Sequence, residues 1–191
     1  MPLIKLLQKP DMPIPGVLGP WAVVSADDYA AFNAGMGVGP MGVGGFVPYD
    51  TDFGPGKVTN LLVTQTDTKT LSAGTTTTGM LRLSGAFSNS VAFLNPSDVL
   101  VLEQGGLLRS DDNFPAALGS ASKPGILTVG SSGSASLARE LVVFNNQNIL
   151  TIAAAIKDPA SVFGAGGGSL ALLKSGAGTL TLAGSNSYSG G

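Results

Sequence analysis

Apolar residues in the second half of the chain fall into short runs that are separated by turn-forming residues. Runs of this length predict β-strands, because a helix needs a longer periodic segment. The predicted strands are residues 61–63, 80–83, 99–102, 126–129, 141–144, 149–152, 170–173 and 179–182. The turn signals between them are Ser84-Gly85, Asn95-Pro96, Gly105-Gly106, Ser131-Ser132-Gly133 and Asp158-Pro159. The first three strands recur about every twenty residues, and a repeat of that length indicates a solenoid.

Alternation within the runs predicts which side chains face the interior, because successive side chains of a strand point to opposite faces. The positions expected to face inward are Leu81, Leu83, Leu180 and Leu182, with Ile152 in the same core column. Those expected to face outward are Arg82, Thr179 and Thr181. Residues 99–102 and 141–144 are apolar on both faces. We therefore expect another segment to cover their outer side.

Strands this short cannot bury an apolar face alone. Stacking them in parallel, with one strand per coil, buries a continuous column of Leu, Val and Ile. The long connection that parallel pairing requires is then supplied by the rest of the coil. We predict an all-β fold of the parallel β-solenoid type, with a β-sandwich or jelly roll as the alternative.

The composition favours a folded, turn-rich β-protein. Apolar residues make up 43% of the 191 residues, whereas only 12% are charged. Disordered chains usually show the reverse. We predict a Pro-rich lead over residues 1–16 and a single β-solenoid over residues 17–191. Within the solenoid, residues 17–56 are expected to form irregular Gly/Pro-rich first coils, and residues 57–191 regular coils that stop at the end of a repeat.

The charge balance and the missing residue types exclude several functions. The net charge is −2 and no basic stripe occurs, so nucleic acid is a poor candidate partner. Neither Cys nor His is present, which excludes disulfides, thiol nucleophiles and the commonest transition-metal ligand. No apolar run is long enough to span a bilayer. Residues 1–7 are too short and too interrupted for a signal-peptide core, so we expect no export signal in this chain.

Two Gly-rich segments superficially suggest phosphate-binding turns. That type of site needs a strand before the turn and a helix after it. Residues 35–40 are followed by more Gly, and we predict a mobile loop there. In residues 54–58, Val58 occupies the position where a Mg²⁺-binding hydroxyl is needed. We therefore expect no cofactor-binding residues and no cofactor.

Acidic residues form three small clusters, Asp27-Asp28, Asp50-Thr51-Asp52 and Asp111-Asp112-Asn113. None has EF-hand spacing, so solvated turns are expected rather than metal sites. Glycoside hydrolysis needs two carboxyl groups about 5–10 Å apart across the bond. The carboxylates fall in turns, and only Arg82 and Lys69 lie on predicted strands. We predict that the chain has no catalytic residues and is not an enzyme.

Three polar or aromatic patterns have both structural and binding interpretations. Residues 145–148 (Asn-Asn-Gln-Asn) predict stacked side-chain amides on adjacent coils. The alternating Thr64, Thr66, Thr68 and Thr70 suit a solvated strand, with ice or glycan binding as the alternative. The aromatic residues Trp21, Tyr29, Tyr49 and Tyr188 are too scattered in sequence to predict a sugar-binding platform.

The last twenty residues read LLKSGAGTLTLAGSNSYSGG. This segment closely resembles the autotransporter-associated β-strand repeat, whose consensus runs roughly L-x-K-x-G-x-G-T-L-x-L-x-G-x-N-x-Y-x-G-G-T. Gly176, Gly178 and Gly184 occupy its turn positions. Upstream, residues 19–32 resemble a G-x-W-A-x-V-x-x-x-D-[WFY]-A-x-[YF] segment that often precedes the repeat, and residues 140–152 resemble a coil found just before it.

The resemblance implies a right-handed parallel β-helix that serves as a non-catalytic passenger segment of an autotransporter-like bacterial surface protein. The implied role is a secreted structural stalk or adhesin at the extracellular cell surface. Without a signal peptide or barrel strands, the chain is expected to be a fragment of the whole protein. Alternatives are a glycan-binding or polysaccharide-active β-helix and a self-associating filament subunit. Expected partners are a surface glycan, a host or neighbouring-cell ligand, or another copy that stacks end to end.

Overall fold

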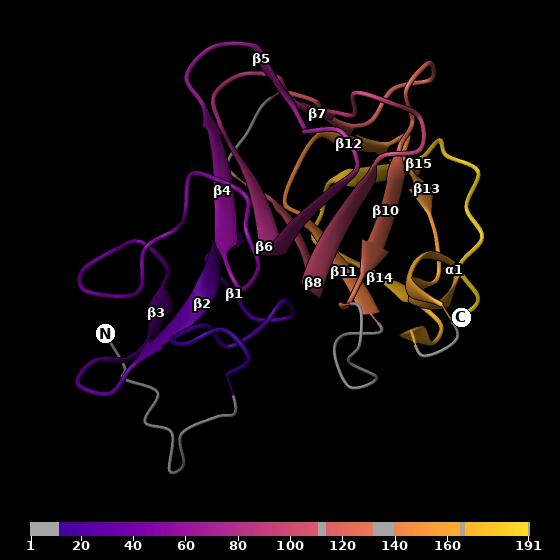
Figure 1. The fold of residues 1–191 in the computed structure, drawn as a ribbon. Helices are drawn as coiled ribbons and strands as arrows, with labels where there is room; N and C mark the ends of the chain where they lie inside the picture. The colour runs from indigo at the N-terminus through magenta and orange to yellow at the C-terminus, as the bar shows by residue number, and fades with distance from the viewer. Residues whose placement is uncertain (1–11, 111–113, 132–139, 165–166, 191) are drawn as a thin grey trace.

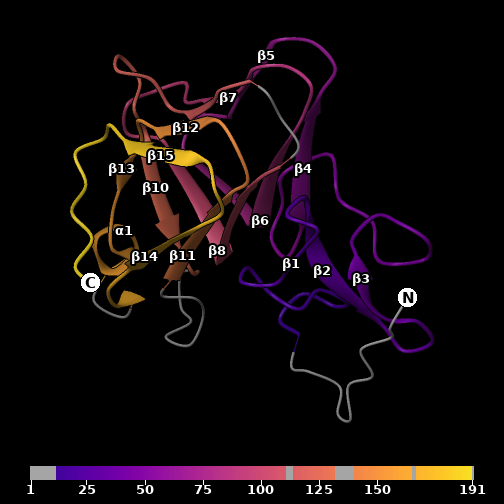
Figure 2. The same ribbon diagram turned by 180° about the vertical axis from the view of Figure 1, so that it is seen from behind.

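The computed structural model describes residues 12–110, 114–131, 140–164 and 167–190, and these are mostly β-structure. One short helix, α1 (Pro159–Phe163), lies among them. Strands of the described ranges form three sheets, one antiparallel and two parallel (Figures 1 and 2). The antiparallel sheet occupies the N-terminal side of the molecule, and the C-terminus lies on the opposite side.

The antiparallel sheet is built from the first part of the chain. It consists of β1 (Val23–Val24), β2 (Asp28–Asn33) and β3 (Gly37–Pro40), in that order. Short connections join these strands, as antiparallel neighbours permit. Residues 35–40 were predicted to be a mobile loop, and that prediction is wrong. Gly37 to Pro40 pair with Ala30 to Asn33, and the buried residues of β3 are its two glycines, Gly37 and Gly39.

A seven-stranded parallel sheet carries most of the core. Its strands are β4 (Val58–Val63), β6 (Thr75–Gly85), β8 (Val99–Arg109), β10 (Ile126–Val129), β11 (Glu140–Asn145), β13 (Ala155–Ile156) and β14 (Ala171–Ser175). The sheet branches at β8, whose first half pairs with β10 and whose second half pairs with β11. Both halves of β8 also pair with β6.

A five-stranded parallel sheet faces the first across the core. Its strands, in spatial order, are β15 (Thr179–Leu182), β12 (Ile149–Ile152), β9 (Ala116–Leu118), β7 (Asn89–Ala92) and β5 (Asp67–Thr70). Each of these strands comes next in the sequence after a strand of the larger sheet, so the chain passes repeatedly from one sheet to the other. The two sheets thereby present their inner faces to the same interior.

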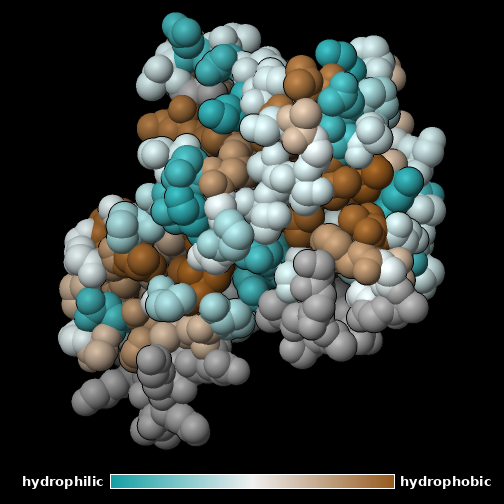
Figure 3. Space-filling view, viewed as in Figure 1, coloured by the Kyte–Doolittle hydropathy of each residue, from teal (hydrophilic) through white to brown (hydrophobic). Residues whose placement is uncertain are grey.

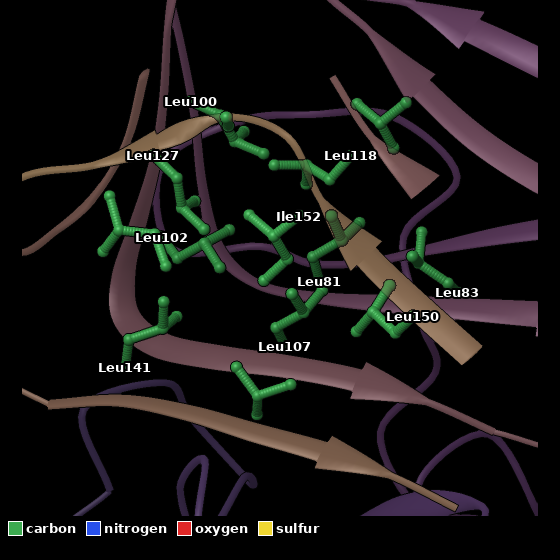
Figure 4. Packing of buried hydrophobic residues seen from close by; sticks show 14 of the residues in the cluster. Leu81, Leu83, Leu100, Leu102, Leu107, Leu118, Leu127, Leu141, Leu150 and Ile152 are labelled. Carbon is green, nitrogen blue, oxygen red and sulfur yellow. The ribbon is translucent and has the colours of Figure 1, made fainter. Parts of the chain in front are cut away.

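The interior between the parallel sheets is a continuous cluster of branched aliphatic side chains (Figure 4). Fully buried members include Leu81, Leu83, Leu100, Leu102, Leu107, Leu118, Leu127, Leu141, Leu150 and Ile152. Each buried side chain of this size stabilises the fold by about 1.5–3 kcal/mol relative to an exposed one. This cluster is therefore the main source of stability.

A second apolar cluster joins the antiparallel sheet to the outer face of the seven-stranded sheet. Tyr29 and Ala31 of β2 pack there against Met80 of β6 and Leu108 of β8. Val101 and Val142 are 2% and 4% exposed, and both lie in runs that are apolar on both faces. The prediction that residues 99–102 and 141–144 have a covered outer side is confirmed.

The predicted right-handed parallel β-helix, a single β-solenoid over residues 17–191, is wrong. The first part of that range forms the antiparallel sheet, and the remaining strands form two separate parallel sheets, one of them branched. The sequence interpretation failed at Gly105-Gly106, which lies inside the eleven-residue strand β8 and does not end it, whereas Ser84-Gly85 does coincide with the end of β6. The alternative sandwich or jelly roll also does not fit, because both large sheets are parallel.

The predicted directions of the side chains are correct in the middle of the molecule and less so at its end. Leu81, Leu83 and Ile152 are completely buried. Leu180 is only partly buried, and Leu182 is 36% exposed, because β15 is the last strand of its sheet. Arg82 was expected to face solvent, but its side chain is 14% exposed and lies beneath the antiparallel sheet.

Candidate functional site

The segment that carries the repeat resemblance, residues 171–190, is called the terminal segment below. It contains β14, a turn at residues 176–178 and β15. Gly176 has φ +82°, a conformation that side chains disfavour. A Cβ at Gly176 would also lie 2.3 Å from the carbonyl oxygen of Asn145. The turn can therefore approach the preceding strand only with glycine at this position.

Asn145, at the end of β11, is the contact point for that turn. Its side chain is completely buried, and its Nδ2 donates hydrogen bonds to the carbonyls of Asn148 (3.1 Å) and Thr179 (2.8 Å). The backbone N–H of Gly178 donates to the carbonyl of Asn145 at 2.9 Å. The predicted ladder of side-chain amides is wrong here, because Asn145 is paired with Arg109 on β8 and bonds to backbone carbonyls.

The second half of the terminal segment also docks on residues that precede it. A Cβ at Gly184 would lie 2.3 Å from the carbonyl oxygen of Ala154. Asn186 accepts a hydrogen bond from the backbone N–H of Ile156 at its Oδ1 (2.9 Å). Tyr188 packs against the main core, and the N–H of Gly190 donates to the carbonyl of Leu170 at 2.9 Å. The characteristic residues of the segment are thus packing residues.

Asp158 holds the end of the terminal segment, at Ser189, close to Leu170. Its carboxylate accepts hydrogen bonds from the backbone N–H groups of Leu170 (2.7 Å) and Ser189 (3.0 Å), and from the hydroxyl of Ser189 (2.7 Å). Burial alone would raise the pKa of Asp158, but these hydrogen bonds outweigh it and lower the pKa below its usual value. The charged form of Asp158 therefore holds the terminal segment to the strands before it.

A polar cluster lies where the antiparallel sheet meets the seven-stranded sheet. Arg82 of β6 forms an ion pair with Asp28 (3.2 Å), donates from Nε to the carbonyl of Asp27 (2.9 Å) and stacks 5.0 Å from the ring centre of Tyr49. Tyr49 donates to Asp28 (3.2 Å) and accepts the N–H of Tyr29 (2.9 Å). These five residues form the Arg82 cluster, which attaches the first sheet to the second.

Burial keeps both tyrosines of the Arg82 cluster neutral. It raises the pKa of Tyr29 and Tyr49 well above the usual value, although the Arg82 guanidinium opposes the shift. A neutral phenol donates its proton, and Tyr29 donates to the carbonyl of Leu81 at 3.2 Å. These two aromatics were judged scattered from their sequence positions, yet the fold brings them together. No local signal could reveal this contact, because Tyr29 and Tyr49 are separated by 20 positions.

The acidic clusters have structural partners where they are described. Asp50 accepts the N–H of Val58 at 3.3 Å, and Asp52 forms an ion pair with Lys57 at 2.7 Å. Asp111-Asp112-Asn113 lies outside the described residues. Among the described residues no group of three or more His, Cys, Asp or Glu side chains could hold a metal ion. The Gly-rich turn at residues 54–58 binds a carboxylate, since Gly56 N–H donates to Glu103 at 2.6 Å.

The outer face of the five-stranded sheet bears small and hydroxyl-bearing side chains. One row across it consists of Thr68, Ser90, Ala117, Thr151 and Thr181. Thr64, Thr66, Thr68 and Thr70 are all exposed, but only Thr68 and Thr70 lie on a strand, so the predicted solvated strand forms only in its second half. Thr68 of β5 thus belongs to a row of small and hydroxyl-bearing side chains that crosses all five strands, which the sequence pattern of residues 64–70 alone could not show.

Comparison with protein-family models, with curated proteins and with solved structures finds no match for this chain. Within the described residues, no helix has the length and apolar character needed to cross a membrane.

Proposed function

We propose that the chain is a non-catalytic structural segment of an exported bacterial surface protein, similar to an autotransporter passenger and serving as a stalk or adhesin. The terminal segment supports this proposal. The contacts of its glycines, Asn186 and Tyr188 are all with the part of the chain that precedes it. A segment with this sequence pattern therefore extends the two parallel sheets by packing on the strands before it. Such growth suits a long, rigid surface module.

The proposal is tested by locating the protein on intact cells of its source organism. An antibody against the chain should label cells that have not been permeabilised, and external protease should remove the label. A periplasmic or cytoplasmic protein measured in parallel controls for cell integrity. Labelling that requires permeabilisation would exclude display at the cell surface.

Self-association through the last strands is a second candidate property. Among the described strands, β14 pairs only with β11, and β15 pairs only with β12. Leu173 is 51% exposed on β14, and exposed strand edges favour pairing with further strands. Sedimentation of the purified chain at increasing concentration tests this property. Association that Leu173→Lys reduces supports it, and a monomer at every concentration contradicts it.

A further inference from the structure

A cavity of about 360 Å³ opens at the end of the core formed by β4 and β5. This cavity, called the β4–β5 pocket, is lined by Thr51, Asn60, Leu61, Leu62, Asp67, Lys69 and Asn89. Hydrophilic side chains gather over this corner of the molecule, at the upper left of Figure 3. The volume lies within the range of roughly 300–1,000 Å³ that small-molecule sites occupy.

The strand register shows why a pocket forms here. Asp67 and Lys69 are aligned with Asn89 and Val91 of β7, which are buried at 1% exposure. The same two rows continue through Ala116 and Leu118 of β9 and through Leu150 and Ile152 of β12. Asp67 and Lys69 therefore occupy core-facing positions that are apolar on β9 and β12. Charged side chains at such positions keep the end of the interior open to water.

Two amide side chains inside the pocket are held in fixed orientations. Asn89 donates from Nδ2 to the carbonyl of Leu61 at 2.7 Å and, at 1% exposure, offers a ligand almost no surface. Asn60 accepts the hydroxyl of Ser84 at 2.7 Å, which leaves its Nδ2 as a donor. Preorganised groups bind a ligand at a lower entropic cost than mobile ones. The pocket thus offers a fixed donor, Nδ2 of Asn60.

The remaining lining groups define the ligand chemistry. The Asp67 carboxylate accepts hydroxyl groups, and the Lys69 ammonium pairs with an anion. Leu62 is 64% exposed and supplies an apolar surface. A ligand that satisfies these groups carries several hydroxyls, a carboxylate and one apolar face, and a uronic acid in its pyranose form has all three.

We propose that the β4–β5 pocket binds a carboxylate-bearing pyranose unit of an acidic glycan. Lys69 pairs with the sugar carboxylate, and Asp67 and Asn60 bind ring hydroxyls. The apolar face of the ring rests on Leu62. This proposal adds a ligand class to the proposed surface role. Its test uses the purified chain, so its failure is distinguishable from failure of the location experiment.

The test is a titration of the full ¹⁵N-labelled chain with three probes: D-glucuronate, methyl β-D-glucopyranoside and acetate. Glucuronate should shift the side-chain amide signals of Asn60 and Asn89 saturably, with millimolar affinity. The glucoside should bind about tenfold more weakly, the equivalent of about 1.4 kcal/mol. Acetate should cause no saturable shift at these signals. Equal binding of acetate and glucuronate, or no binding of either sugar, would overturn the proposal.

A matched pair of variants places the ligand. Lys69→Gln should weaken glucuronate about tenfold and leave the glucoside unchanged, because only the ion pair is lost. Lys123→Gln removes an exposed lysine outside the pocket and should change neither affinity. Both positions are exposed, so the variants should fold, and their amide spectra verify it. Equal effects of the two substitutions, or none from Lys69→Gln, would reject the assignment of Lys69.

Discussion

The two ends of the parallel sheets share one backbone register but differ in the side chains that they present to the interior. At the β15 end, Leu180 and Leu182 continue the apolar rows of Leu150 and Ile152. At the β5 end, Asp67 and Lys69 stand in the same rows, and a pocket replaces packed core. The difference shows that strand pairing alone does not define a core. One end is suited to adding further strands, and the other to binding a polar ligand.

The largest loss of stability is expected from a charged side chain at a core-facing position of a central strand. Ile152→Asp should lower the free energy of unfolding by about 4 kcal/mol, because it buries an unpaired carboxylate and removes an aliphatic side chain. Thr151→Asp, on the outer face of the same strand, is the control and should cost far less. Urea unfolding measures both. Equal losses would show that the inward assignment of Ile152 is wrong.

The same charge should be tolerated better at the ends. Leu180 is only partly buried, so Leu180→Asp should cost clearly less than Ile152→Asp. Lys69→Leu, at the β5 end, should change stability by about 0.5 kcal/mol or less, as exposed substitutions usually do. If Leu180→Asp proved as damaging as Ile152→Asp, the β15 end would be part of the main core.

The attachment of the antiparallel sheet is the next effect in size. Arg82→Met removes the hydrogen bond to the carbonyl of Asp27 and the ion pair with Asp28, and it should lower stability by about 1.5–3 kcal/mol. Amide exchange in β2 should accelerate at the same time. Lys57→Met, which removes an exposed ion pair with Asp52, should cost much less stability than Arg82→Met, because solvent screens that pair. An unchanged exchange rate in β2 would mean that apolar contacts alone hold this sheet.

Docking of the terminal segment can be examined through one glycine. Gly176→Ala should destabilise the chain by about 1–3 kcal/mol, because of its positive φ and the close carbonyl of Asn145. Gly74→Ala is a matched control with φ +88° and no atom within 4 Å of the added Cβ. Its cost should reflect the backbone strain alone. If both variants lost the same stability, the close approach to Asn145 would contribute nothing.

Acid should remove the stability that the carboxylates of Asp98 and Asp158 contribute to the fold. Hydrogen bonds from the backbone N–H of Gly74 and from Asn95 lower the pKa of Asp98, and those from Leu170 and Ser189 outweigh burial to lower the pKa of Asp158. A lowered folded-state pKa contributes stability above the unfolded value of about 3.9, which is lost as the pH falls through the folded pKa. The urea concentration at the unfolding midpoint should therefore decrease as the pH is lowered below about 4. In Asp158→Asn this decrease should be smaller. If the pH dependence of the urea midpoint were the same in this variant as in the original chain, Asp158 would not contribute to acid sensitivity.

Local patterns in the sequence predicted most of the strands but not their arrangement. The alternation around Leu81 and Leu83 correctly gave their burial, because it depends only on the two-residue period of a strand. It could not show that β8 would pair with three other strands, since a pairing partner lies far away in sequence. β5, β7 and β9 lack long apolar runs, and their strand character arises from pairing with neighbours.

The candidate sites illustrate the same limit. The glycines of the terminal segment were identified as turn positions from their match to the repeat consensus. Their contacts with Asn145 and Ala154 became evident only in the three-dimensional structure. Lys69 was recognised as a charged residue on a strand. Its location in a pocket depends on the register with Val91, which no local pattern reveals.

Native-state hydrogen exchange of the backbone amides tests the central claim most directly. That claim is that stability resides in the middle strands and decreases toward both ends of the parallel sheets. The account predicts the slowest exchange in β8 and β12, with faster exchange in β5 and β15, each of which pairs with a single strand among the described residues. Uniform protection across the five-stranded sheet, or slower exchange in β5 than in β12, would contradict it.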